Sequence, residues 1–269
     1  MRKTCFRAET QGRREERKPS PDLLPIPGFH GVREALTRRA GHMDIKAVWV
    51  ARGKRSTRMD EIMALARKRG IPVEYKPPQQ LDRLAPHVAH QGMVALAAGF
   101  AYTRLDDMLK AERGKAGYAL LLALDHITDE GNLSALIRSA AFFGVQGLII
   151  PRDRSAQITP TVLKRASGAC AHLPVSQVVN MARTLEFLNN RGFWIIGTSG
   201  QGPTSIYRFD WNRDVVLVLG NEERGIGKAV QKQCHDTVHI PSPGSLDALN
   251  VSVAGAVILS EISRQQHPG

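Results

Sequence analysis

The chain has 269 residues, of which 42% are hydrophobic, enough for one large domain or two ordinary ones with a proper core. It has no run of about 18 apolar residues and no apolar segment at its basic N-terminus, so we expect no membrane span, no secretory signal and a cytoplasmic location. Cys5, Cys170 and Cys234 stand far apart, without the spacing of a zinc site, so we expect reduced thiols and no metal.

The formal net charge of +12 is unevenly distributed along the chain. Residues 1–116 contain 24 Lys and Arg against 13 Asp and Glu, whereas residues 117–269 contain 13 against 12. A local positive field attracts a polyanion, and without an amphipathic basic helix a nucleic acid is a better partner than a membrane. Composition alone is equally compatible with a basic tail kept for solubility.

The first part of the chain predicts a tail followed by a small domain. Residues 1–26 are charged, contain proline and lack apolar periodicity, so we expect a disordered tail. A small α/β domain follows over residues 27–100, and residues 101–116 form a linker with a short amphipathic helix. The elements expected in the small domain are a helix over 29–40, a strand over 45–51, a helix over 58–70, and strands over 71–76 and 90–98.

The second part, residues 117–269, alternates apolar strands with helices. The expected strands cover residues 118–125, 147–151, 193–199, 214–220 and 237–241. The expected helices cover residues 132–144, 159–169, 182–192, 227–234 and 248–265. This alternation predicts an α/β fold with a parallel sheet covered on both faces.

Four segments follow strands of this sheet, where ligands of open α/β sheets bind. They are rich in Gly, Asn or acidic residues: DHITDEGN (125–132), GTSGQGP (197–203), GNEERGIG (220–227) and IPSPGSLDALN (240–250). GxGxxG does not follow the first strand, and GxxxxGK[ST] is absent, which disfavours NAD and ATP. The glycines and main chain of the last two segments suit a small polar and apolar ligand, such as one with an adenine ring.

Several polar residues near these segments are candidates for chemistry. Asn132 is placed to cap the helix that follows it, and Arg138 is the only charge in that helix, so it either reaches solvent or is used internally. Glu222 follows a strand end, where a solvated carboxylate or a helix cap is the ordinary role. Asn250 and Ser252 begin the last helix, where both residue types favour capping. Taken singly, none specifies a function.

Taken together, three segments resemble the motifs of a known family in order and spacing: NLSALIRSAAFFG (132–144), VLVLGNEERGI (216–226) and IPSPGSLDALNVSVAGAVILSE (240–261). The family is the SpoU (TrmH) family of S-adenosylmethionine-dependent RNA 2′-O-methyltransferases, in the SPOUT superfamily. RASGACAHLPV (165–175) also resembles a family segment. FHGVREAL and HQGMVALAA are similar to the start and end of the ribosomal-protein-like RNA-binding domain that many members carry. The chain most resembles the branch that methylates a guanosine of 23S ribosomal RNA.

The resemblance implies a fold and a site. It implies a SPOUT methyltransferase domain over residues 117–269 with a deep trefoil knot, and a homodimer with active sites at the subunit interface. RNA is the implied partner, and neither DNA nor a membrane is expected. The implied S-adenosylmethionine site comprises Thr198, Gly200, Leu219, Gly220, Asn221, Gly225, Ile240 and Leu249. The implied catalytic and substrate-positioning set comprises Arg138, Asn132, Glu222 and Asn250.

The implied reaction needs a ribose hydroxyl to become a better nucleophile, with the methyl group held in line. The family assigns the role of base to the arginine that Arg138 matches. A guanidinium stays protonated at neutral pH, so an orienting and electrostatic role, on the 3′-phosphate and the developing alkoxide, suits Arg138 better. Glu222 would then order Asn132, and Asn250 would support the last motif.

Three departures from the family pattern leave other functions open. Ala248 stands where a serine is common, Ser134 replaces a frequent glycine, and Asp-Glu-Gly-Asn replaces the commoner Asp-Pro-x-Asn. The first alternative keeps the reaction but changes the RNA to transfer RNA or another ribosomal site, as in resistance-type enzymes. The second is a non-catalytic RNA-binding or ribosome assembly factor with the same fold, for which Ala248 is the only hint.

Overall fold

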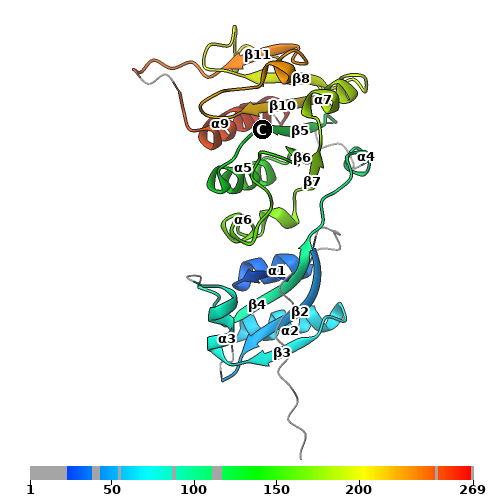
Figure 1. Ribbon diagram of the computed structural model, residues 1–269, viewed down its shortest axis with the longest axis vertical. Coiled ribbons are helices and arrows are strands. Elements are labelled where there is room, and N and C mark those ends of the chain that lie inside the picture. Colours follow the sequence, from blue (N-terminus) through cyan, green and yellow to red (C-terminus); the bar gives the residue numbers. More distant parts are fainter. Residues whose placement is uncertain are drawn as a thin grey trace, which may run out of the picture.

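The computed structural model describes residues 23–37, 43–53, 56–86, 89–110, 117–245 and 248–267. Within them the chain builds two sheets, one of four strands and one of seven, stacked along the long axis of the molecule (Figure 1). No helix in these ranges is long and apolar enough to cross a lipid bilayer.

The N-terminal sheet has the strand order β1-β4-β2-β3. β2 and β3 run parallel, whereas β4 runs antiparallel to both β1 and β2. The elements are β1 (Leu24–Pro27), α1 (Phe29–Thr37), β2 (Met43–Ala51), α2 (Thr57–Lys68), β3 (Val73–Lys76), α3 (Pro78–Leu84) and β4 (Met93–Phe100). The two helices and three strands expected here are therefore present.

Two elements of this sheet differ from the expectation. Residues 24–26, expected in the tail, belong to β1, because the apolar Ile26 is buried and Leu24 pairs with Ala97 of β4. The expected tail up to residue 22 lies outside the described residues. The segment after β3 forms α3, which begins at Pro78, where proline fits the first helical position, and buries Leu81.

The connection between the sheets contains the expected short helix, α4 (Leu105–Met108). Residues 111–116 of the expected linker lie outside the described residues. The two parts of the chain also touch directly, because Oε2 of Glu34 on α1 lies 2.6 Å from Nε2 of His172. A Cβ atom at Gly168 would lie 3.2 Å from the Glu34 side chain, so this contact is close.

The second sheet has the order β7-β6-β5-β10-β8-β11-β9, and all its pairings are parallel, as expected. Its elements are β5 (Leu120–Asp125), α5 (Glu130–Phe142), β6 (Gly147–Pro151), α6 (Pro160–Arg165), η1 (Ala169–Ala171), β7 (Val175–Val178), α7 (Met181–Asn189), β8 (Trp194–Thr198), β9 (Thr204–Ser205), β10 (Val215–Gly220), α8 (Lys228–Gln231), β11 (Asp236–His239) and α9 (Val251–Gln266). The edge strands β7 and β9 were not expected.

Helices cover both faces of this sheet, as the apolar strands predict. Along β5, Leu122 and Leu124 belong to a core shared with α5, α6 and α9, whereas Leu121 and Ala123 face a second core with α7 and α8. α5 and α9 lie side by side on the first face (Figure 1). The expected trefoil knot stays a prediction.

Candidate active site

The four segments expected to handle ligands end up at one edge of the seven-stranded sheet. They follow β5, β8, β10 and β11, and the strand order places these four strands next to one another. Because the strands are parallel, their carboxyl ends meet at the same edge. The sheet order therefore confirms that segments up to 125 residues apart in the chain share this edge.

Asn132 does not cap α5, contrary to one reading of the sequence. The helix begins earlier, at Glu130, and its cap is Asp129, whose Oδ1 accepts the main-chain amide of Asn132 at 2.7 Å. The Asn132 side chain is therefore available for other partners.

Asn132, Glu222 and Asn250 form one hydrogen-bonded network across three segments. Oε1 of Glu222 accepts from Asn132 Nδ2 at 3.0 Å and from Asn250 Nδ2 at 2.6 Å. Asn250 Nδ2 also donates to Asn132 Oδ1 at 3.0 Å. The Glu222 carboxylate additionally accepts the amide of Val251 at 3.3 Å, so its negative charge stands at the positive N-terminal end of α9.

The polar pair at the start of α9 has two roles at once. Oδ1 of Asn250 accepts the main-chain amide of Ser252 at 2.9 Å, so Asn250 is the helix cap. The same oxygen accepts from Ser252 Oγ at 2.6 Å. With its oxygen held by Ser252, the Asn250 amide must direct its NH₂ group toward Glu222 and Asn132.

A buried carboxylate that the sequence analysis did not single out holds the Glu222 loop in place. Asp125, at the end of β5, is 1% exposed, and its Oδ2 accepts the amide of Gly227 at 2.7 Å. Its Oδ1 lies 2.7 Å from Nδ1 of His126. The carbonyl of His126 accepts from Asn221 Nδ2 at 3.1 Å, so Asp125 and His126 together fix both ends of the 221–227 loop. The available signal was a single acidic residue at the end of an otherwise apolar strand.

The loop itself turns tightly. The main chains of Asn221 and Gly225 exchange two hydrogen bonds, of 3.0 and 2.8 Å, and Gly225 has a φ of 63° that favours glycine. A Cβ atom on Gly220 would lie 2.3 Å from the Gly225 carbonyl carbon. Both glycines are therefore needed to fold the loop back.

Several expected cofactor residues have their side chains engaged in the protein. Thr198 Oγ1 donates to the Val218 carbonyl at 3.0 Å, the Asn221 oxygen accepts the Glu223 amide at 2.9 Å, and the Leu219 side chain is buried. The side chains of these three residues are thus used within the protein, and the main chain of Asn221 is paired with Gly225.

Ile240, Leu249 and Gly200 keep groups available for a ligand. No hydrogen bond joins the main-chain amides of Ile240 and Leu249 to another described residue. The Leu249 side chain is 48% exposed, and Gly200 lies exposed in the turn after β8. Free amides beside apolar surface suit the adenine and methionine parts of S-adenosylmethionine, so the residues fit that cofactor.

Arg138 lies two turns beyond Asn132 on α5 and does not join the network. Its side chain is exposed and has no hydrogen-bond or ion-pair partner among the described residues. The cation is therefore free to bind an external anion. The sequence left open whether Arg138 reaches solvent or is used inside the protein, and in the structure it faces solvent.

Metal-binding groups do not gather within the described residues, where no cluster of three His, Cys, Asp or Glu occurs. Burial raises the pKa of the Cys170 thiol to about 12 and that of Cys234 to about 11. Neither thiol is therefore a nucleophile at neutral pH.

Curated relatives cover most of the chain. The chain is 35% identical over 221 residues to the Bacillus subtilis (strain 168) protein YacO, which carries the name of a TrmH family tRNA/rRNA methyltransferase, covering 82% of this chain and 88% of YacO. It is 36% identical over 242 residues to a protein of the same family name from Staphylococcus aureus (strain MSSA476), covering 90% of this chain and 96% of the relative.

Solved structures share the fold. The SpoU methyltransferase AviRb from Streptomyces viridochromogenes, in complex with AdoMet, aligns with a TM-score of 0.77 and 24% identity over 92% of both chains. An AdoMet-bound rRNA methyltransferase from Sinorhizobium meliloti aligns with a TM-score of 0.75 and 22% identity over 92% of this chain and 89% of the other.

Two family matches divide the chain in the same way as its two sheets. Residues 25–103 match the family described as RNA 2′-O ribose methyltransferase substrate binding. Residues 119–260, more than half of the chain, match the SpoU rRNA Methylase family. The chain therefore belongs to the SpoU rRNA methylase family, as the three motifs in its sequence predict.

Proposed function

We propose that the protein, an RNA 2′-O-ribose methyltransferase of the SpoU family, methylates a guanosine ribose of 23S ribosomal RNA with S-adenosylmethionine as methyl donor. Such an RNA is met in the cytoplasm, where we place the protein. The observation that carries the proposal is the network of Asn132, Glu222 and Asn250 on the sheet edge where Ile240 and Leu249 leave amides free.

The cofactor, when bound, supplies a methyl group made electrophilic by its sulfonium. The protein must then hold the ribose 2′-oxygen in line with that carbon and exclude other orientations. Asn132, Glu222 and Asn250 act as positioning residues, because each already uses its polar atoms on the other two. They fix the start of α5 against the start of α9, which fixes the walls of the site.

Arg138 is the group that we assign to the RNA. Its guanidinium is free of protein partners among the described residues and offers a positively charged fork of N–H donors. It can bind the phosphate next to the target ribose with two parallel N–H donors and stabilise the negative charge that develops on the 2′-oxygen. The role is electrostatic, so no proton needs to leave the guanidinium, and the proton of the 2′-hydroxyl is released to solvent.

A homodimer belongs to the same proposal. Leu249 and Val253, at and just after the start of α9, are 48% and 49% exposed. Apolar side chains exposed next to the site support the expectation that a second copy covers this region. Light scattering on the purified protein measures the mass directly, and a monomer at micromolar concentration would contradict this part of the proposal.

A second candidate changes only the RNA. Both curated relatives carry names that include transfer RNA as well as ribosomal RNA, which favours keeping transfer RNA as the alternative. Purified protein with tritiated S-adenosylmethionine and total RNA from a strain lacking the gene tests both. Incorporation into 23S ribosomal RNA at a guanosine 2′-oxygen is expected, whereas label in transfer RNA alone selects the alternative.

The non-catalytic alternative has its own test. Calorimetry of the folded protein with S-adenosylmethionine is expected to show binding. A folded protein that neither binds S-adenosylmethionine nor labels any RNA would overturn the enzymatic proposal.

A further inference from the structure

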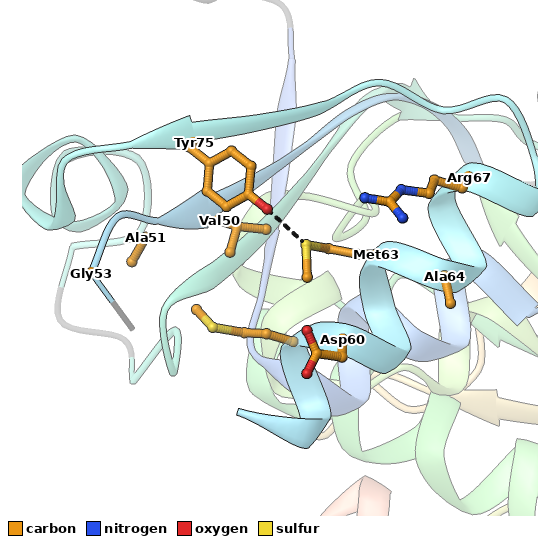
Figure 2. Close-up of a pocket in the computed structure, with 9 residues that line it drawn as sticks. Val50, Ala51, Gly53, Asp60, Met63, Ala64, Arg67 and Tyr75 are labelled. Atoms are coloured by element: carbon orange, nitrogen blue, oxygen red, sulfur yellow. Dashed lines mark hydrogen bonds between the residues drawn. The ribbon is translucent and has the colours of Figure 1, made fainter. Parts of the chain in front are cut away.

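The N-terminal sheet contains a cavity of about 680 Å³ that the proposed active site does not use. It lies between α2 and the carboxyl ends of β2 and β3, at the far end of the molecule from α5 and α9 (Figures 1 and 2). Ligand sites typically measure roughly 300–1,000 Å³, so the cavity is large enough for a planar ring. Its lining residues are Val50, Ala51, Gly53, Met59, Asp60, Met63, Ala64, Arg67 and Tyr75.

The cavity combines an apolar floor with an exposed aromatic wall. Val50 and Met59 are buried, whereas Tyr75 is 51% exposed. The Tyr75 hydroxyl donates to Sδ of Met63 at 3.0 Å, and this bond holds the ring on one side of the cavity (Figure 2). A ring fixed in this way offers a face for stacking and loses little conformational freedom when a planar ligand binds.

Two side chains of opposite charge line the cavity from α2. Neither the Asp60 nor the Arg67 side chain has a hydrogen-bond or ion-pair partner in the described part of the chain. The neighbouring acidic groups are occupied, because Glu61 accepts from Arg33 at 2.7 Å and Glu74 lies 2.8 Å from Lys76. Asp60 and Arg67 are therefore available to a ligand.

The segment of the sequence that supplies the cavity residues is basic. Residues 50–76 contain eight Lys and Arg against three Asp and Glu. Arg52 Nε donates to the Tyr75 carbonyl at 3.3 Å, which places a cation next to the main chain of β3 at this residue. A positive surface that attracts phosphates, combined with an aromatic face for stacking, is the arrangement that binds single-stranded nucleic acid.

We propose that this cavity binds an unpaired guanine of the RNA substrate, at a site separate from the methyl-transfer site. The inference rests on the proposed function, because it takes the attracted polyanion to be RNA. The base stacks on Tyr75, and Arg67 binds a neighbouring phosphate. A base within a helix cannot enter the cavity, because its faces stack on neighbouring bases and its pairing edge bonds to the complementary base.

Asp60 selects the base. The pairing edge of guanine presents two adjacent donors, N1–H and the N2 amino group, and an ionised carboxylate offers two acceptor oxygens. Adenine and cytosine each place an acceptor nitrogen next to their amino group, and a carboxylate repels that nitrogen. Guanine is therefore the base that satisfies both oxygens of Asp60.

Fluorescence anisotropy with the full chain tests the base preference. The probe is a fluorescein-labelled uridine RNA with a single central guanosine, and matched probes replace the guanosine with inosine, which lacks the N2 amino group, or with adenosine. The guanosine RNA is expected to bind at least about fivefold more tightly than either. Equal affinity for the three RNAs would overturn the assignment of guanine.

Variants of the cavity test the stacking. Tyr75→Leu is expected to weaken binding of the guanosine RNA by about tenfold, within the range measured for loss of one stacked base. Tyr75→Phe keeps the ring and is expected to bind within about twofold of the wild type.

Asp60→Asn is expected to remove the preference for guanosine. Arg67→Gln removes the proposed phosphate contact and is expected to weaken binding of the guanosine RNA. Arg83→Gln, which removes an exposed cation on α3 outside the cavity lining, is its matched control and is expected to bind as the wild type does.

Assays of methyl transfer distinguish an error in this inference from an error in the proposed function. Tyr75→Leu is expected to raise the KM for RNA while leaving kcat at saturating RNA and the affinity for S-adenosylmethionine unchanged. A Tyr75→Leu protein with wild-type affinity and wild-type KM overturns the cavity proposal and leaves the enzymatic one standing. A wild-type protein that labels no RNA but still prefers the guanosine probe overturns the proposed function and supports the cavity.

Discussion

The amide nitrogen of Asn250 donates a hydrogen bond of 2.6 Å to the carboxylate of Glu222, and this contact joins the start of the last helix to the loop after β10. Glu222→Ala leaves the NH₂ groups of Asn132 and Asn250 without their acceptor. Each hydrogen bond to a charged group contributes roughly 1.5–3 kcal/mol, so we expect kcat/KM to fall about ten- to hundredfold. Glu222→Gln keeps an acceptor oxygen and is expected to lose less.

The matched control for this change is Glu223→Ala. Glu223 is the next residue and is exposed, and its side chain forms no hydrogen bond or ion pair with another described residue. Steady-state methyl transfer is expected to distinguish the two positions, and equal losses at Glu222 and Glu223 would contradict the role given to the network.

Arg138→Ala tests the electrostatic assignment. The side chain is exposed and unpaired within the described residues, so its removal is expected to leave Tm unchanged within about 1 °C. Loss of an electrostatic contact to the transition state is expected to lower kcat by about a hundredfold or more. Arg183→Ala, at another exposed arginine on α7, is the control and is expected to retain full activity. An active Arg138→Ala enzyme would remove Arg138 from the mechanism.

Asp125→Ala is expected to destabilise the protein and weaken cofactor binding together. The buried carboxylate accepts the Gly227 amide at 2.7 Å, and a hydrogen bond to a charged group contributes about 1.5–3 kcal/mol. Asp125→Asn retains one acceptor oxygen and is expected to be milder. Thermal unfolding with and without S-adenosylmethionine measures both effects, and a normal shift of Tm on adding the cofactor to Asp125→Ala would show that the 221–227 loop does not depend on this residue.

Gly255→Ala is expected to loosen the packing of α9. A Cβ atom there would lie 2.6 Å from Cδ2 of Leu136 and 2.8 Å from Cδ1 of Leu219, and both leucines are buried. Alanine gains about 1 kcal/mol of helix propensity, but overpacking a core costs about 1–3 kcal/mol, so the net expectation is a loss of unfolding free energy. Urea denaturation measures it, with Ser260→Ala on the exposed side of α9 as the control.

The Cys170 thiol is expected to resist alkylation in the folded protein. Burial raises its pKa to about 12, above the value near 8.5 of an unfolded chain. The native state therefore keeps its proton, and this contribution to stability is fully present below about pH 8.5 and declines as the pH rises toward 12. Mass spectrometry after iodoacetamide treatment at pH 8.5 is expected to show labelling of Cys170 only once guanidinium is added.

The sequence predicted the central strands because their signal is local. The runs that form β5 and β10 are apolar up to their last residue, and a parallel strand buried on both faces needs that pattern. The edge strands β7 and β9 are short, and β7 carries Ser176 and Gln177, so nothing in their composition separates them from loops. Their pairing depends on the neighbouring strand and not on their own residues.

The site was predictable to a similar extent. Family motifs singled out Asn132, Glu222 and Asn250, and the structure joins them by hydrogen bonds. The sequence left open whether Asn132 caps α5, because Asp129 and Asn132 are both good capping residues and the choice depends on where packing starts the helix. The contact of Asp125 with Gly227 spans 102 positions, a separation at which no local pattern predicts a hydrogen bond.

Because Asn250 comes late in the sequence, its hydrogen bonds to Glu222 and Asn132 form late in synthesis. A ribosome that has translated as far as β11 has made every strand of the sheet, yet Glu222 still lacks both donors that α9 brings. The network that joins α5, the loop after β10 and α9 can therefore form completely only after the last helix has docked.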